Sequence, residues 1–209
     1  MRAGGSMFIS FDGVDGVGKS TQTELFVEWL REQGRTVVTC RDPGSTELGE
    51  RLRTLVLKAS DIKIDAESEM LLYMAARAQL VAEVIEPALA AGQVVVSDRF
   101  LLANVVYQGH AAGLEPQSIW DVGNVATAGQ QPDLTIVLDM PLEKAVSRIG
   151  RELDRMEAKG SEFLQRVRQG FLTEAERAPE QIKVINADQE IEQVQADIRQ
   201  VARECLEVS

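Results

Sequence analysis

Five short apolar segments recur along the chain, and helical stretches with an apolar residue every three or four positions lie between them. The apolar segments span residues 7–12, 36–40, 93–98, 133–139 and 182–186. Four of them are continuous apolar runs rather than alternations, which is typical of strands buried on both faces of a sheet. Strands that alternate with helices predict an α/β fold, with a five-stranded parallel sheet covered by helices on both faces.

The helical periodicity predicts helices over 20–34, 46–58, 65–92, 141–153, 160–178 and 190–206. Pro87 lies inside the third of these and is expected to kink or interrupt it. Pro141 lies at a favoured first position of the fourth helix. Because no repeat, low-complexity segment or interdomain linker breaks the pattern, we expect one α/β domain over residues 1–209.

Composition and charge narrow the possible partners of this domain. The net charge of −11 argues against a nucleic-acid polymer, whose phosphates favour basic surfaces. No apolar run approaches the roughly 20 residues that span a bilayer, so we expect no membrane partner. The two cysteines form no metal or disulfide pattern, so we expect a reducing cytoplasm. His110 is the only histidine, and a single histidine makes a histidine base or a histidine metal cluster improbable. We expect His110 in a surface loop.

A phosphate-binding motif follows the first strand. Gly13-x-x-x-x-Gly18-Lys19-Ser20 matches the P-loop pattern and leads directly into a helix, as that motif requires. Glycines let backbone N–H groups turn toward a phosphate, and the start of the helix adds a partial positive charge. We therefore expect a P-loop NTPase three-layer sandwich with a phosphate loop at 13–20. The expected ATP-binding residues are Gly13, Gly16, Gly18, Lys19, Ser20 and Thr21, with Lys19 at the terminal phosphates and Ser20 on Mg²⁺.

The loop alone does not choose among a kinase, a GTPase and an ATP-driven motor. The N-K-x-D element that reads guanine is absent, since the residues after Asn104, Asn124 and Asn186 are valine, valine and alanine. A motor usually has a strand that ends in two acids, whereas "TIVLDMP" has one. A nucleotide-dependent binding switch without an acceptor substrate stays open at this point.

Four further blocks follow the loop in order: "RDPGSTELGERLR" (41–53), "LLYMAARAQ" (71–79), "SDRFLLANVVYQG" (97–109) and "GRELDRME" (150–157). Together with the loop they resemble the thymidylate kinase family over residues 7–206. The resemblance implies phosphorylation of dTMP to dTDP with MgATP, in the cytoplasm, by a homodimer. The apolar helical surface around 65–91 and 115–129 is a candidate for the dimer contact. A related kinase that prefers dUMP is the alternative reaction.

The resemblance also implies roles for individual residues on the acceptor side. Arg99 would contact the acceptor phosphate and the transferring group, and Arg41 and Arg53 would help to hold the acceptor. The carboxylate of Asp15 would point toward the 3′-hydroxyl of the acceptor and also touch a Mg²⁺-bound water; otherwise it only caps the loop backbone. Asp98 joins Ser20 as a metal residue.

The base pocket follows from the same resemblance. Tyr73 would stack on thymine and Arg77 would hydrogen-bond a base carbonyl, and their spacing of four places both on one helix face. Tyr107 would crowd out a 2′-hydroxyl, while Asn104 and Gln108 would line the pocket. A plain core role for Tyr73 remains the alternative. The sequence departs from the family pattern at Ser45, Phe100 and Ala103.

The segment at about 148–158 is expected to form a lid. The loop carries Gly16 and Val17 after its acid, where some relatives carry an arginine, so the lid would supply the catalytic arginine instead. On one helix, Arg148, Arg151 and Arg155 would share a face. We expect Arg151 first and Arg148 second to be catalytic, and Arg155 to hold the lid in place; a solvated arginine stripe is the alternative.

Overall fold

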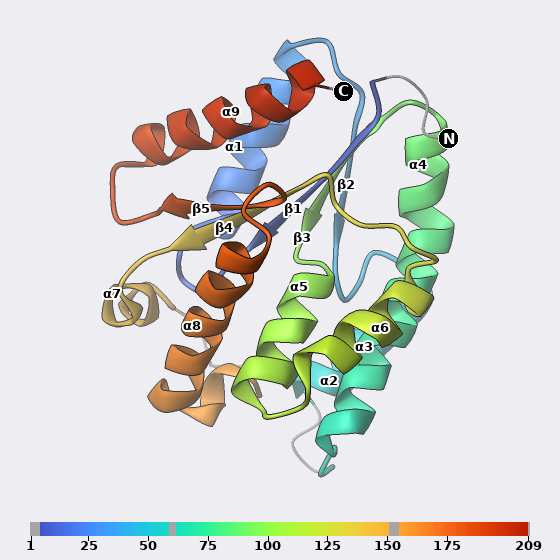
Figure 1. Ribbon diagram of the computed structural model, residues 1–209, viewed down its shortest axis with the longest axis vertical. Coiled ribbons are helices and arrows are strands. Elements are labelled where there is room, and N and C mark those ends of the chain that lie inside the picture. The colour runs from blue at the N-terminus through green and yellow to red at the C-terminus, as the bar shows by residue number, and fades with distance from the viewer. Residues whose placement is uncertain (1–4, 59–61, 151–154, 209) are drawn as a thin grey trace.

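The computed structural model describes residues 5–58, 62–150 and 155–208, and its centre is a five-stranded sheet (Figure 1). The strands are β1 (Met7–Asp12), β2 (Val37–Arg41), β3 (Val94–Asp98), β4 (Leu134–Asp139) and β5 (Ile182–Asn186). Their order is β2-β3-β1-β4-β5, and every neighbouring pair is parallel. The predicted parallel α/β sheet is therefore confirmed.

Helices cover both faces of this sheet. They are α1 (Lys19–Glu32), α2 (Glu47–Lys58), α3 (Ala66–Leu80), α4 (Glu86–Ala90), α5 (Leu101–Asn104), α6 (Pro116–Ala126), α7 (Leu142–Ser147), α8 (Ser161–Arg177) and α9 (Ile191–Val208). Two π-helical segments, η1 (Val81–Ile85) and η2 (Val105–Ala111), and a 3₁₀ turn, η3 (Glu157–Lys159), complete the order. Helices α1 and α9 pack on one face, and α4 and α8 on the other (Figure 1). Among the described residues, no helix combines the length and the apolar character that crossing a bilayer requires.

Strand β1 contributes side chains to two separate apolar layers, because successive side chains of a strand point to opposite faces of the sheet. The Phe11 ring lies 5.5 Å from the Phe26 ring of α1, whereas the Phe8 ring lies 4.9 Å from the Phe100 ring on the other face. All four phenylalanines are fully buried. Burial of one such side chain contributes roughly 1.5–3 kcal/mol, so these two layers fix β1, and the loop after it, firmly in place.

The expectation that the strands are buried on both sides holds for the three central strands and is wrong for the edge strands. Thr39 and Arg41 of β2 are exposed, and so is Val184 of β5. An edge strand has a neighbouring strand on one side only, which leaves its outer edge open.

The long helix predicted over 65–92 is interrupted, as Pro87 suggested. The regular helix α3 ends at Leu80, and the π-helical η1 carries the chain to Ile85 before α4 begins. Proline has no N–H to donate to the preceding turn, and its ring crowds that turn. The wider π-helical turn lies just before Pro87, where those constraints act.

The helix predicted over 141–153 is shorter than expected. Pro141 is the capping residue before α7 rather than its first residue, and α7 ends at Ser147. The N–H groups of Arg148 and Ile149 donate to carbonyls three residues back, which is a closing 3₁₀ turn. Because the helix ends there, the prediction that 148, 151 and 155 share one helix face is wrong for Arg148.

Candidate active site

A cavity of about 1040 Å³ opens at the edge of the sheet where the strands β1, β2 and β3 end. Ligands of open α/β sheets bind at this carboxyl edge. With two exceptions, the residues predicted for the site line this cavity: Asp15, Gly16, Gly18, Lys19, Ser20, Thr21, Arg41, Arg53, Tyr73, Arg77, Asp98, Arg99, Asn104, Tyr107, Gln108 and Arg148. The exceptions are Gly13, the first residue of the loop, which is not among the lining residues, and Arg151, which lies outside the described residues.

The phosphate loop between β1 and α1 packs closely on the neighbouring backbone. Gly13 has a φ of 126°, and a Cβ there would lie 2.4 Å from the Leu138 carbonyl oxygen. Gly16 has a φ of 87°, and a Cβ there would lie 2.0 Å from the Ala145 carbonyl oxygen. Only glycine fits both the positive φ and the close approach. The loop thus winds tightly over the ends of β4 and α7, and it leads into the first turn of α1.

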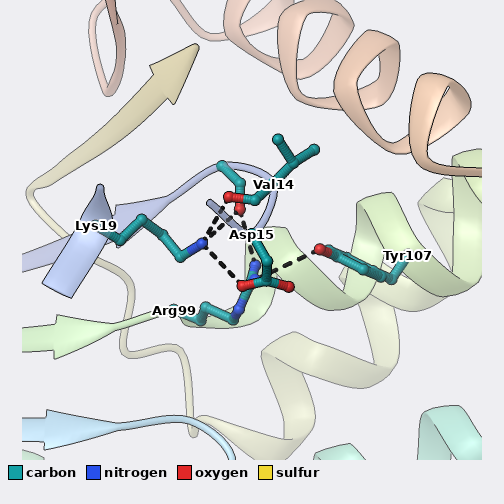
Figure 2. Close-up of polar contacts among 6 residues, drawn as sticks. Val14, Asp15, Lys19, Arg99 and Tyr107 are labelled. Carbon is teal, nitrogen blue, oxygen red and sulfur yellow. Dashed lines mark hydrogen bonds and ion pairs between the residues drawn. The ribbon is translucent and has the colours of Figure 1, made fainter. Parts of the chain in front are cut away.

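Lys19 reaches back across the loop from the first turn of α1 (Figure 2). Its Nζ donates to the carbonyl oxygens of Gly13 and Val14 at 3.0 and 2.8 Å and lies 3.2 Å from Asp15 Oδ1. Burial lowers the pKa of Lys19, and the nearby Arg99 lowers it further, while Asp15 opposes both. The ammonium is therefore held by three oxygens at the centre of the loop.

Arg99 approaches the same carboxylate from the end of β3 (Figure 2). Its Nη2 donates to Asp15 Oδ1 at 2.7 Å, and its Nη1 to the Gly13 carbonyl at 3.1 Å. Burial raises the pKa of Asp15, but Arg99 and Lys19 outweigh burial and hold it below its ordinary value. Asp15 is thus an ionised carboxylate that bridges the two cations. Their positive charge explains why a negative charge is tolerated in a phosphate loop.

The backbone of Arg99 has a φ of 67°, a left-handed conformation that is unusual for arginine. Two hydrogen bonds hold it, since its N–H donates to the Phe11 carbonyl and its carbonyl accepts from Ser97 Oγ at 2.6 Å. The guanidinium carbon lies 5.2 Å from the centre of the Tyr107 ring. Residues in such strained conformations cluster at functional sites, where the surrounding structure holds them in place.

The side chains predicted for the base pocket come from α3, α5 and η2. Tyr73 is half-buried on the cavity wall, as a stacking residue would be. Arg77 is only 1% exposed, and its Nε donates to Asp42 Oδ2 at 2.5 Å. Its Nη1 donates to Asn104 Oδ1 at 3.1 Å, and Asn104 Nδ2 donates to Gln108 Oε1 at 2.6 Å. Most of the donors of Arg77 therefore serve the protein itself.

Arg41 and Arg53 lie where β2 leads into α2. Arg41 pairs with Glu50 through Nη2 at 2.8 Å, and Arg53 Nη1 donates to the Pro43 carbonyl at 2.9 Å. Ser45, which departs from the family's glycine, has a φ of 62°. Its N–H donates to Glu50 Oε1 at 2.8 Å, and its Oγ accepts from the Arg41 N–H at 2.9 Å. These bonds stabilise Ser45 in a backbone conformation that glycine adopts more readily.

Asp98, at the end of β3, lines the cavity. Its Oδ1 is buried without a hydrogen-bond partner among the described residues. The Ser20 hydroxyl lies on the same cavity. A hydroxyl and a spare carboxylate oxygen suit Mg²⁺, which keeps several waters and takes few protein ligands. No cluster of three or more His, Cys, Asp or Glu side chains suited to a metal occurs in the described ranges.

Asp12, which the sequence analysis missed, is the last residue of β1 and is completely buried. Neither of its oxygens has a hydrogen-bond partner among the described residues. Burial raises its pKa to about 8, although Arg99 and Lys19 oppose that rise. No sequence signal marked Asp12 as a site residue, because it directly precedes the P-loop pattern and is not part of it.

The segment predicted as a lid contributes to the cavity at both of its ends. Arg148, Ile149 and Gly150 line the cavity from one side, and Met156 from the other. Arg155 points away from the cavity opening, because its Nε donates to the Val56 carbonyl at 2.7 Å and its guanidinium pairs with Glu69. These contacts tie the end of the segment to α2 and α3.

His110 is not the surface-loop residue that we expected. It lies in η2, and its Nε2 is 2.7 Å from Glu174 Oε1 of α8. The helix after Phe100 continues through Ala111, and α8 packs against it closely enough that a Cβ at Gly170 would lie 2.9 Å from His110 Cβ. This close packing leaves the His110 side chain half-buried.

The far end of the cavity was not foreseen at all. It is formed by residues after β5 and in the first turn of α9: Ala187, Gln189, Glu190, Ile191 and Val194. Gln22 Nε2 of α1 donates to the Ile191 carbonyl at 3.0 Å and joins this wall to the phosphate loop. The rule that parallel strands end at one edge would have indicated this loop, because it follows the last strand.

The fold and this site define a P-loop phosphotransferase, in which one cavity joins a phosphate loop to a second, polar and aromatic pocket. The family profile described as "Thymidylate kinase" matches residues 11–198, and the chain belongs to the thymidylate kinase family.

Individual relatives agree with this assignment. A thymidylate kinase of Rhodopirellula baltica is 46% identical over 89% of this chain and 76% of its own length. That of Symbiobacterium thermophilum is 43% identical over 96% of this chain and 94% of its own. The crystal structure of thymidylate kinase from Ehrlichia chaffeensis is 32% identical with a TM-score of 0.78, over 95% of this chain and 99% of that one.

Proposed function

We propose that this chain transfers the γ-phosphoryl group of ATP to the 5′-phosphate of dTMP, which yields dTDP and ADP for the synthesis of dTTP. The observation that carries the proposal is the position of Arg99 and Asp15. Arg99 hydrogen-bonds to Asp15 of the phosphate loop, and both line the cavity that Tyr73, Asn104 and Gln108 also line. A kinase of this type must hold two polyanions head to head, and cations at that junction serve this need. Residues 1–209 would act as one catalytic domain.

On the donor side, the backbone N–H groups of the loop and the start of α1 face the phosphates. Lys19 would exchange its loop carbonyl partners for oxygens of the terminal phosphates. Ser20 and Asp98 would hold Mg²⁺, which neutralises charge on the phosphates when bound. Gln189, Glu190 and Ile191 lie at the end of the cavity where the rest of ATP would extend.

On the acceptor side, the Asp15 carboxylate would accept a hydrogen bond from the 3′-hydroxyl of dTMP, and Arg99 would hold its phosphate. Arg41 and Arg53 add positive charge at the same end of the cavity. Tyr73 would stack on thymine, and Arg77 would present its remaining N–H to a base carbonyl. Tyr107 is buried against Phe163 and Phe171, with ring centres 6.3 Å away in each case, so a 2′-hydroxyl would meet a fixed ring.

Charge that develops on the transferring group would be met by Arg148 and Arg151, while Arg155 anchors the segment. Arg148 is exposed at the rim of the cavity and can turn toward it. An arginine that binds only the transition state raises kcat rather than affinity. Positioning and charge stabilisation therefore suffice, and no covalent intermediate is needed.

The test is direct measurement of products. Purified protein with MgATP and dTMP should form dTDP and ADP in equal amounts, whereas Lys19→Ala should lose nearly all of that activity. ADP formation with dUMP but not dTMP would favour the alternative kinase. Nucleotide binding without any acceptor turnover would favour the binding switch.

We also propose a cytoplasmic homodimer built on α3 and α6, which lie side by side (Figure 1). Leu71 of α3 and Val125 of α6 are 53% and 81% exposed, and large apolar side chains in such positions mark protein contacts. Sedimentation should give twice the 23.0 kDa chain mass, and Leu71→Glu should lower it to one chain. A wild-type monomer at assay concentration would refute the dimer.

A further inference from the structure

Glu69, in the first turn of α3, is a buried carboxylate that stands behind the base pocket rather than in it. It is 2% exposed and is not among the residues that line the cavity. A buried carboxylate is costly unless it is paired and hydrogen-bonded, so its partners are informative. Nothing in the proposed transfer of phosphate assigns it a role.

Both oxygens of Glu69 have partners. Oε1 accepts a hydrogen bond from Gln108 Nε2 at 2.7 Å, and Oε2 pairs with the Arg155 guanidinium. Lys159 Nζ lies 3.8 Å from Oε1. Two cations thus flank this carboxylate, and one side chain of the cavity wall hydrogen-bonds to it.

An ionised carboxylate accepts hydrogen bonds and cannot donate them. Gln108 must therefore turn its Nε2 toward Glu69, which leaves its Oε1 facing Asn104. Asn104 Nδ2 donates to Gln108 Oε1 at 2.6 Å, which leaves Asn104 Oδ1 to accept from Arg77 Nη1 at 3.1 Å. Arg77 can only donate, so the chain from Arg77 to Glu69 runs in one direction.

The direction of this chain matters because Asn104, Gln108 and Arg77 all line the cavity where the nucleobase would lie. An amide that is turned around exchanges its donor for its acceptor, so a fixed orientation presents a fixed pattern to the base. Thymine has a carbonyl at C4 and an N–H at N3, whereas cytosine has an amino group and a bare N3. The two bases therefore need opposite patterns at this edge.

We propose that Glu69 is a positioning residue that sets base specificity: its carboxylate, held by Arg155, fixes the amide orientation of Gln108, while Arg77 fixes that of Asn104 from the other end of the chain. The inference rests on the proposed function, since it takes the cavity as a nucleobase pocket. It adds a specificity determinant outside the cavity, and it connects the segment that ends at Arg155 to base recognition.

Arg155 is part of the same device. Its Nε is fixed by the Val56 carbonyl, so the guanidinium reaches Glu69 from a defined position. Without that cation, Oε2 loses its guanidinium partner, and the position of the carboxylate against Gln108 is no longer fixed.

Glu69→Gln tests the proposal with almost no change in volume. An amide at this position has one accepting end for two donors, Gln108 Nε2 and the Arg155 guanidinium, so one of the two contacts sets donor against donor while the packing stays. The preference for dTMP over dCMP, measured as the ratio of kcat/KM values, should fall about tenfold or more, which corresponds to one misdirected hydrogen bond. Arg155→Gln should lower the same ratio. Glu67→Gln, an exposed change in the same helical turn, should leave it at the wild-type value.

An unchanged ratio in folded Glu69→Gln would overturn the proposal, and so would a loss of thermal stability without any change in the ratio. If Glu69→Gln does not fold, Arg155→Gln decides by the same criterion. Calorimetric titration of dTMP and dCMP without ATP gives the preference independently of turnover. A wild-type protein that makes no dTDP would therefore refute the proposed function, while the titration would still decide the role of Glu69.

Discussion

The ion pair between Asp42 and Arg77 lies at the junction of the acceptor loop and the base pocket, and it should carry a large share of the stability. The two side chains are 0% and 2% exposed. The other partners of the Arg77 guanidinium are the neutral atoms of Asn104, Met74 and Phe100. Asp42→Asn therefore leaves a buried cation without an anion, which costs roughly 3–5 kcal/mol when a buried pair is broken.

We expect the lower end, about 3 kcal/mol, because asparagine can still accept the bond from Nε. That is a substantial part of the roughly 5–15 kcal/mol that stabilises a typical domain. For a chain of this size it corresponds to a fall in Tm of about 6–12 °C. Urea unfolding followed by circular dichroism, together with calorimetry, measures both quantities.

Two comparisons separate the ion pair from a general effect of mutation. Glu47→Gln breaks the Glu47–Arg51 pair, whose side chains are 83% and 76% exposed, and should change Tm little. The double variant Asp42→Asn/Arg77→Met removes both charges and should be more stable than Asp42→Asn alone. Burial raises the pKa of Asp42, and Arg77 opposes that rise. If Asp42→Asn is as stable as the wild type, the carboxyl is protonated in the folded protein and the ion-pair reasoning is wrong.

Four further expectations concern individual side chains of the cavity and of the strand behind it. Asp15→Asn should raise KM for dTMP about tenfold or more, by loss of a charged acceptor, with ATP affinity nearly unchanged; unchanged KM would leave Asp15 a loop-capping role. Tyr107→Ala should reduce the preference for dTMP over its ribose counterpart while Tyr107→Phe keeps it, and an unaltered ratio in the alanine variant removes the ring from the sugar pocket. Arg148→Ala or Arg151→Ala should lower kcat at least about tenfold with near-normal dissociation constants, since contact is made mainly in the transition state; normal kcat in both excludes a lid arginine. The pKa of Asp12 is raised from 3.8 to about 8, so the folded state keeps a proton that the unfolded chain releases. This contribution to stability is complete below pH 4 and is lost as pH rises to about 8, by up to about 1.4 kcal/mol per pH unit. Asp12→Asn should remove that slope, and equal slopes in the two proteins would show that Asp12 is ionised.

The sheet and the loop could be predicted because each has a local signal, whereas the acceptor-side residues were proposed from the resemblance to the family. Continuous apolar runs marked the strands, and the spacing of Gly13, Gly18 and Lys19 marked the loop. The ends of parallel strands meet at one edge, which is why residues as distant in sequence as Arg41 and Arg99 line one cavity.

Other features depend on contacts that no local pattern encodes. The burial of Arg77 depends on Asp42, which is 35 residues away in the sequence, and the contact of His110 with Glu174 depends on the packing of α8 against η2. The early end of α7 escaped prediction because the residues after Ser147 still follow a helical pattern. Glu69 did have a signal, since it lies four residues before Tyr73 on one helix, but its partners Gln108 and Arg155 come from other elements.

The most direct test of the account is a competition among acceptors. Equal amounts of dTMP, dUMP, dCMP, dAMP and dGMP are incubated in one tube with limiting MgATP, and the nucleoside diphosphates are separated by chromatography at early times. The account predicts that dTDP forms first and predominates, in step with ADP. Predominance of any other deoxynucleoside diphosphate, or ADP release without any of them, would contradict it.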